Sequence, residues 1–223
     1  MRNWYNWSFV LVLLLFACED QFQAQVTDFG YDYFPLEVGS YKIYEVMMVT
    51  FDAQGPDTSR YQLKTTITES SGGDYYLLRR ETRSDEGEEW NISDVWTLRR
   101  DQYIAVATEE NLPLVKMTFP VVINRQWNGN ALNVLGVGNY QFVEASSAIY
   151  DDLIGDAGKI QVQIADVPQN LVNQDQRFEV YAKGVGLVEK NYIILNFCTS
   201  NCGSNEVDSG IIIEQVLIAY GQD

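Results

Sequence analysis

The chain has 223 residues, of which 46% are apolar, so it can bury a substantial hydrophobic core as one large domain or two small ones. Fifteen basic residues stand against 31 acidic ones, which excludes a basic surface of the kind that binds nucleic acid. The sequence contains no histidine. This excludes Ser-His-Asp triads, Cys-His pairs and histidine-based zinc sites.

The first 17 residues have the layout of a secretory signal peptide. Arg2 supplies the positive charge, residues 9–16 form an uninterrupted apolar run, and Ala17 is the small residue that ends it. The run is much shorter than the ~20 residues that a membrane-spanning helix requires. An uncleaved anchor or a buried helix is the less favoured interpretation.

The segment Leu15-Phe16-Ala17-Cys18 resembles a bacterial lipobox. The resemblance implies that Cys18 becomes the first residue of the mature protein and carries the lipid that anchors it in the outer membrane. Glu19 and Asp20 resemble a signal for export to the cell surface, although a solvated tether explains them equally well. We therefore expect an outer-membrane lipoprotein that faces the periplasm or the cell surface, with the surface slightly favoured.

The domain organisation follows from these features. We expect a signal peptide at 1–17, the lipidated cysteine and a polar tether at 18–32, and a single β-rich domain at 33–223. The remaining two of the three cysteines, Cys198 and Cys202, lie in a loop-like Thr/Ser/Asn/Gly segment. Because disulfides persist outside the cytoplasm, this pair is predicted to form a bridge across a loop tip.

Alternation of apolar and polar residues dominates the rest of the chain. It is clearest in residues 61–67, 160–164 and 178–182, and it predicts strands with one face in water. About ten strands are expected, since one of the eleven candidate segments is dispensable. The candidate segments are 41–51, 59–69, 75–83, 90–99, 102–108, 112–119, 140–149, 158–166, 176–183, 187–197 and 210–220.

The predicted fold class is all-β, an antiparallel up-and-down meander that curls into a lipocalin-like barrel or half-barrel. Turn-forming segments such as 52–57 and 84–89 separate the strands, and short connections favour sequential antiparallel neighbours. The last segment, 210–220, is apolar on both faces and is therefore expected to be a central or barrel-closing strand. A two-sheet β-sandwich is the alternative.

Three segments resemble a loose group of uncharacterised β-rich envelope lipoproteins. They are 33–46, with an FPLxxGxxxxY start, 119–130, and 179–190, which contains KGVGLV. The resemblance implies a β-rich extracytoplasmic domain and no particular activity. Gly184 and Gly186 have a structural explanation, because glycines in such a segment usually mark a bulge or a close backbone approach.

Asp151, Asp152 and Asp156 are the best candidates for a cation site. They lie in a short segment with two glycines and offer the hard oxygen ligands that Ca²⁺ prefers. The spacing does not match an EF-hand loop. A capped turn or the start of a short helix is the simpler interpretation, so no metal or other cofactor is expected.

Trp90, Trp96 and Trp127 are candidates for a surface on which a sugar would stack. The even spacing of the first two would place them on one face of an unbroken strand. Core packing and cross-strand pairing are the alternative for all three residues.

These features favour a non-enzymatic, lipid-anchored binding or assembly module of the envelope. The expected partners are the membrane, through the lipid on Cys18, and either an outer-membrane protein complex or a small hydrophobic or sugar ligand. One alternative is a carrier that holds a hydrophobic small molecule in its barrel, which requires a cavity of several hundred Å³. The other is a carbohydrate-active enzyme with paired carboxylates, a pair that the sequence cannot single out among 31 acids.

Overall fold

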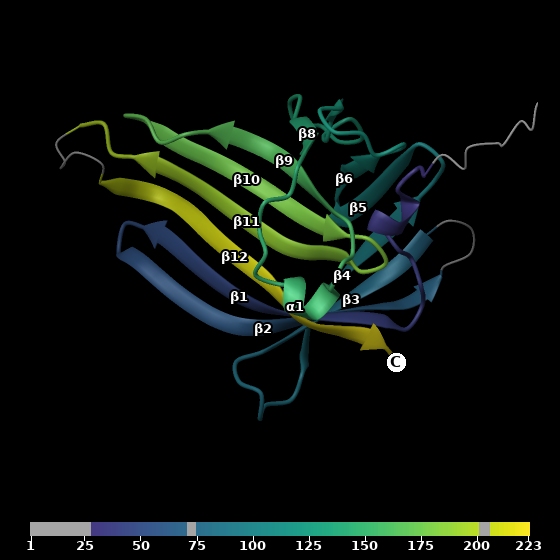
Figure 1. Ribbon diagram of the computed structural model, residues 1–223. Coiled ribbons are helices and arrows are strands. Elements are labelled where there is room, and N and C mark those ends of the chain that lie inside the picture. Colours follow the sequence, from purple (N-terminus) through teal and green to yellow (C-terminus); the bar gives the residue numbers. More distant parts are fainter. Residues whose placement is uncertain (1–27, 71–74, 201–205) are drawn as a thin grey trace, which may run out of the picture.

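A computed structural model describes residues 28–70, 75–200 and 206–223. The described residues form one antiparallel sheet of twelve strands, a short 3-10 helix η1 (Tyr31–Tyr33) and a single helical turn α1 (Asp151–Ile154) (Figure 1). The strands are β1 (Ser40–Asp52), β2 (Gly55–Ser70), β3 (Tyr75–Arg83), β4 (Asn91–Arg100), β5 (Ile104–Glu109), β6 (Leu112–Thr118), β7 (Gln126–Asn128), β8 (Asn139–Val143), β9 (Lys159–Val167), β10 (Asn173–Ala182), β11 (Gly186–Phe197) and β12 (Val207–Gln222).

The sheet is an up-and-down meander that closes on itself almost completely. Its strand order is β6-β5-β4-β3-β2-β1-β12-β11-β10-β9-β8-β7, so the first and last strands pair in the middle. The remaining gap lies between β6 and β7. Two hydrogen bonds cross this gap, from the Val115 amide to the Gly129 carbonyl (2.8 Å) and from Trp127 Nε1 to the Val115 carbonyl (2.8 Å). The result is a nearly closed barrel.

The predicted fold class is confirmed, and each of the eleven candidate segments contains a strand. The additional strand is β7, whose three residues are too short to show an alternating pattern. The segment expected at 140–149 is a strand only as far as Val143, after which the chain runs to α1. The last segment is central as expected, because β12 lies between β1 and β11.

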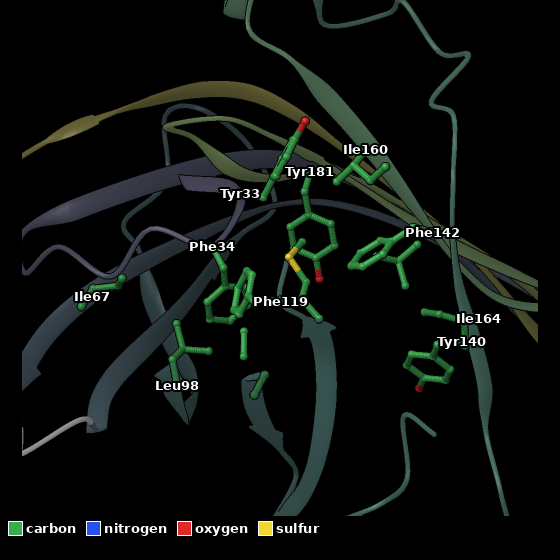
Figure 2. Close-up of a cluster of buried hydrophobic side chains, with 14 residues drawn as sticks. Tyr33, Phe34, Ile67, Leu98, Phe119, Tyr140, Phe142, Ile160, Ile164 and Tyr181 are labelled. Carbon is green, nitrogen blue, oxygen red and sulfur yellow. The ribbon is translucent and has the colours of Figure 1, made fainter. Parts of the chain in front are cut away.

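A cluster of fourteen buried side chains fills much of the space that the sheet encloses (Figure 2). Alternate residues of β9 contribute Ile160, Val162 and Ile164, each at most 5% exposed, as the period-two pattern predicts. Phe34 joins this cluster from the segment that precedes β1. Arg100 holds that segment in place by donating hydrogen bonds to the carbonyls of Tyr31 (2.6 Å) and Phe34 (2.7 Å).

The turn between β10 and β11 brings two distant segments together. Gly184 and Gly186 have φ values of 74° and 88°, a backbone region that favours glycine. A Cβ atom at Gly186 would lie 3.3 Å from the Pro35 ring and 3.4 Å from Cε of Lys42. The glycine therefore permits a close approach by two side chains, whereas the sequence indicated a bulge or a close backbone approach. In the described part of the chain, no helix is both long and apolar enough to cross a membrane.

Candidate ligand site in the barrel

The barrel contains a cavity of about 90 Å³ that is bordered by residues of β1 to β6 and β10 to β12. Its lining follows the strand period: Leu63, Thr65 and Ile67 on β2 all contribute, while the residues between them do not. This confirms the face that the alternation assigned to β2. Other strands and the segment before β1 complete an apolar wall that includes Phe34, Leu78, Leu98 and Leu187.

A buried network of charged side chains forms one side of the cavity. Lys116 on β6 and Glu179 on β10 are 4% and 1% exposed, and their ion pair measures 2.6 Å between Nζ and Oε1. Lys116 also contacts Glu109 Oε1 at 3.0 Å, and Lys190 lies 3.8 Å from the other oxygen of that carboxylate. The four side chains come from four strands, and only the closed sheet brings them together.

Two tyrosines complete the environment of Glu179. The hydroxyl of Tyr181 donates to Oε2 at 2.6 Å, and the hydroxyl of Tyr192 donates to Oε1 at 2.7 Å. Together with Lys116, they give both carboxylate oxygens a partner, as a buried charge requires.

The charges of this network decide its protonation state. Burial by itself acts to raise the pKa of Glu179, but the positive charges of Lys116 and Lys190 and the hydrogen bonds outweigh it, so its pKa lies well below the usual value. The pKa of Glu109 is lowered for the same reason, mainly by Lys116 against the effect of burial. Burial acts to lower the pKa of Lys116, yet its two carboxylate partners raise it. Glu109, Lys116 and Glu179 are therefore all ionised at neutral pH.

Lys42 borders the same cavity but differs from these residues. Its backbone pairs within the sheet, but its ammonium group has no hydrogen-bond or ion-pair partner among the described residues, although the side chain lies half-buried against Gly186. Burial lowers the pKa of its ammonium group to about 8. At neutral pH the Lys42 ammonium is thus mostly charged, its solvation is reduced, and the described part of the chain offers it no counter-ion.

The cavity is electropositive within a strongly acidic chain. Four basic side chains border it, those of Lys42, Arg80, Lys116 and Lys190, against the two acidic side chains of Glu109 and Glu179. Arg80 is paired with Asp94 at 3.2 Å, and the charges of Lys116 and Lys190 are balanced by Glu179 and Glu109, with which they form ion pairs. The charge left over is that of Lys42. The arrangement can therefore accept an anion at the edge of an apolar space.

The sequence did not indicate Lys116 or Glu179 as site residues. Glu179 occupies a position that the alternation of Phe178, Val180 and Ala182 assigns to the wet face, and Lys116 lies between the apolar Val115 and Met117. In the structure, Val180 and Glu179 are both buried, because β10 is covered on both faces at this point. The available signal was weak: each is a lone charged residue between apolar neighbours in a predicted strand.

The structure does not bring the three predicted calcium ligands together as a site. Asp151 begins α1 and pairs with Lys159 at 2.5 Å, which neutralises the carboxylate. Among the residues described, no group of three or more acidic or cysteine side chains is placed so that it could hold a metal ion. The segment around Asp151, Asp152 and Asp156 thus follows the simpler interpretation, the start of a short helix.

The three tryptophans do not share a surface. Trp90 precedes β4 and stacks under the guanidinium of Arg83, 4.3 Å from the ring centroid. Trp96 borders the cavity, packs under Arg80 at 3.7 Å and donates from Nε1 to a carboxylate of the β5–β6 turn at 3.1 Å.

Trp127 packs in the barrel, where its ring centroid lies 4.5 Å from that of Phe142. Because a register shift interrupts β4 between Asp94 and Ile92, the even spacing of the first two tryptophans does not place them on one face.

Two of the predicted cysteine roles fall outside the described residues. Cys18 and Cys202 are both in segments that the structure does not describe. Cys198 follows the end of β11, and its amide donates to the carbonyl of Glu206 at 2.8 Å. Lipidation of Cys18 and the bridge between Cys198 and Cys202 stay predictions.

Comparison with known proteins assigns no family. No protein-family profile and no curated protein matches the chain. A solved structure, of lipid–protein interactions in lipovitellin, aligns with this chain. The alignment covers 84% of this chain and 26% of the lipovitellin chain, at 8% identity and a TM-score of 0.38. This chain thus spans about a quarter of that one, and a likeness at this level carries no conclusion about function.

Proposed function

We propose that this protein is a non-enzymatic, lipid-anchored binding module of the envelope whose barrel site takes a small organic anion with an apolar body. The observation that carries the proposal is the position of Lys42, a half-buried cation beside an apolar wall with no partner among the described residues. A ligand carboxylate at Lys42 would replace the missing counter-ion. A hydrogen bond to a charged group of this kind contributes about 1.5–3 kcal/mol.

The cavity volume supports a small ligand. A single buried water needs roughly 10–15 Å³ of accessible cavity volume. A cavity of about 90 Å³ therefore suits a short carboxylic acid and is too small for a bulky lipid. For this reason we prefer an anion-binding module to a carrier of a large hydrophobic molecule.

The carboxylates of the site support a non-enzymatic function. Cleavage of a glycosidic bond by paired carboxylates requires one carboxyl group that stays protonated, with a raised pKa. Glu109 and Glu179 instead both have lowered pKa values, because Lys116 lies between them. Both carboxyl groups therefore stay ionised, and neither is suited to act as a general acid.

The proposal can be tested by calorimetric titration of the mature protein in phosphatidylcholine nanodiscs, with empty nanodiscs as the blank. The probes are hexanoate and hexanol, which share a chain length and differ in charge. We expect hexanoate to bind at least about tenfold more tightly, and Lys42→Gln to remove this preference, since a charged hydrogen bond is lost. Binding of hexanoate should also weaken from pH 7 to pH 9, because Lys42 loses its proton near pH 8.

Lys64→Gln is the matched control. Lys64 lies on the neighbouring strand β2, does not border the cavity, and pairs with the exposed Asp223 at 3.6 Å. It should leave hexanoate binding unchanged. Equal affinity for hexanoate and hexanol, or equal losses in Lys42→Gln and Lys64→Gln, would contradict the proposed anion site.

A further inference from the structure

The connection between β7 and β8 exposes a group of aliphatic side chains. Val134 is 98% exposed, Val137 74%, Leu135 53% and Leu132 43%. Isolated exposed aliphatic residues are common on soluble proteins, but four within six residues form a continuous apolar tip. We refer to residues 130–138 as the apolar loop.

Asparagine side chains hold the apolar loop in a defined shape. Asn128 Oδ1 accepts hydrogen bonds from the amides of Asn130 (3.0 Å) and Gly138 (2.9 Å). Asn133 Oδ1 accepts one from the amide of Leu135 (2.9 Å). These bonds satisfy backbone donors within the loop itself, which lowers the cost of moving it out of water.

The loop also lies in a stretch without charge. Between Arg125 and Glu144 there are 18 consecutive residues with no Asp, Glu, Lys or Arg, in a chain where 21% of residues are charged. Transfer of the loop into an apolar medium would therefore bury no charged side chain. A neutral tip also avoids the repulsion that a net charge of −16 would otherwise produce at an anionic surface.

The first described residues lie beside the segment that leads into β7. The amide of Val121 donates to the carbonyl of Phe29 at 3.0 Å, and the neighbouring Val122 and Ile123 are 48% and 40% exposed. In Figure 1 this purple segment and the teal connections around β8 lie on the same, upper side of the molecule. The ten residue-to-residue steps from Cys18 to Asp28 span at most about 35 Å, so a lipid on Cys18 would keep this side near the bilayer.

We propose that the apolar loop inserts its aliphatic tip into the interfacial region of the membrane to which the protein is anchored. The inference rests on the lipid anchor of the proposed function and is independent of the anion site. A bilayer is a better match than a protein partner, because the loop lacks the Trp, Tyr and Arg residues that dominate protein–protein hot spots. Lys and Glu are also absent from the loop, as insertion into an apolar layer requires.

Quenching of an introduced tryptophan by brominated lipids tests the insertion. Val134→Trp in the full chain, lipidated and incorporated into phosphatidylcholine vesicles, places an indole at the most exposed position of the tip. Vesicles with bromine near the top of the acyl chains should quench this variant roughly twofold more than the wild type, since interfacial insertion reaches ~5–10 Å. The wild type provides the background from its own tryptophans.

Ile92→Trp is the matched control. Ile92 is 65% exposed at the start of β4, next to the β3–β4 loop, which projects from the lower side of the molecule in Figure 1. Its quenching should equal that of the wild type. If the protein fails to associate with vesicles, the anchor and the insertion are both wrong. If it associates but Val134→Trp is quenched no more than Ile92→Trp, only the insertion is wrong, and the loop is a surface for a protein partner instead.

Discussion

Removal of the Lys116 ammonium provides the most direct test of the buried network. Lys116→Met keeps an unbranched chain of similar length but leaves two carboxylates without their shared cation. Among the described residues, Glu179, 1% exposed, then keeps its two tyrosine donors, and Glu109 keeps Lys190 at 3.8 Å.

The expected loss of stability is large. Breaking a buried ion pair by removal of one partner costs about 3–5 kcal/mol, because an uncompensated charge stays buried. A protein of this kind has only about 5–15 kcal/mol of unfolding free energy, so the variant should be clearly less stable yet measurable. Lys116→Met combined with Glu179→Gln should recover part of the loss, since it removes the orphaned charge as well as its partner.

The pH dependence separates electrostatics from packing. In the wild type the pKa of Glu179 is lower in the folded state than in the unfolded state. Its contribution to the free energy of unfolding is therefore fully present above about pH 4.5 and is lost as the pH falls through the folded-state pKa. Without Lys116, we expect burial to outweigh the remaining charge of Lys190 and the tyrosine hydrogen bonds, and to raise the pKa of Glu179 above the unfolded value. The loss of unfolding free energy that this buried charge causes in the variant is then at its full value at pH 7.5 and decreases on acidification to pH 5. Over the same pH range the contribution of Glu179 to the stability of the wild type stays constant.

Urea unfolding, monitored by tryptophan fluorescence, gives the difference in unfolding free energy between Lys116→Met and the wild type at pH 7.5 and at pH 5. Lys64→Met serves as the surface control, because its pair with the exposed Asp223 should contribute no more than about 1 kcal/mol. A loss of less than 1 kcal/mol for Lys116→Met, or the same loss at both pH values, would show that the network does not carry the stability assigned to it here, roughly 3–5 kcal/mol.

Two further predictions concern the anchor and the barrel seam. Cys18→Ala should abolish lipidation and membrane retention, and detergent partitioning equal to that of the wild type would instead indicate an uncleaved anchor. Gly129→Ala should cost at least about 1–3 kcal/mol, because the new Cβ would lie 2.3 Å from the ring of Tyr140. Gly136→Ala, with no atom within 4 Å of its Cβ position, should leave the urea midpoint unchanged, and similar midpoints for both variants would argue against tight packing of Tyr140 on Gly129 at the seam.

Sequence by itself was sufficient for the fold class because strand periodicity is local. The alternation over 160–164 gave the correct buried face of β9, and the doubly apolar segment 210–220 correctly indicated a central strand. Glycine at position 186 indicated a bulge or a close backbone approach, and the structure shows instead a close approach by the side chains of Pro35 and Lys42. These inferences depend only on residues within a few positions of one another.

The site depended on information that no local pattern contains. Lys116 and Glu179 are 63 residues apart, and alternation assigns the position of Glu179 to the wet face of its strand. They meet because the sheet closes with its seam between β6 and β7, and because β10 is covered on both faces where Glu179 lies. The same closure leaves Lys42 beside an apolar wall without a partner among the described residues. Sequence determined which segments become strands, whereas the curvature of the closed sheet decided which charges are buried together, since only the tertiary structure sets the distance between strands far apart in the chain.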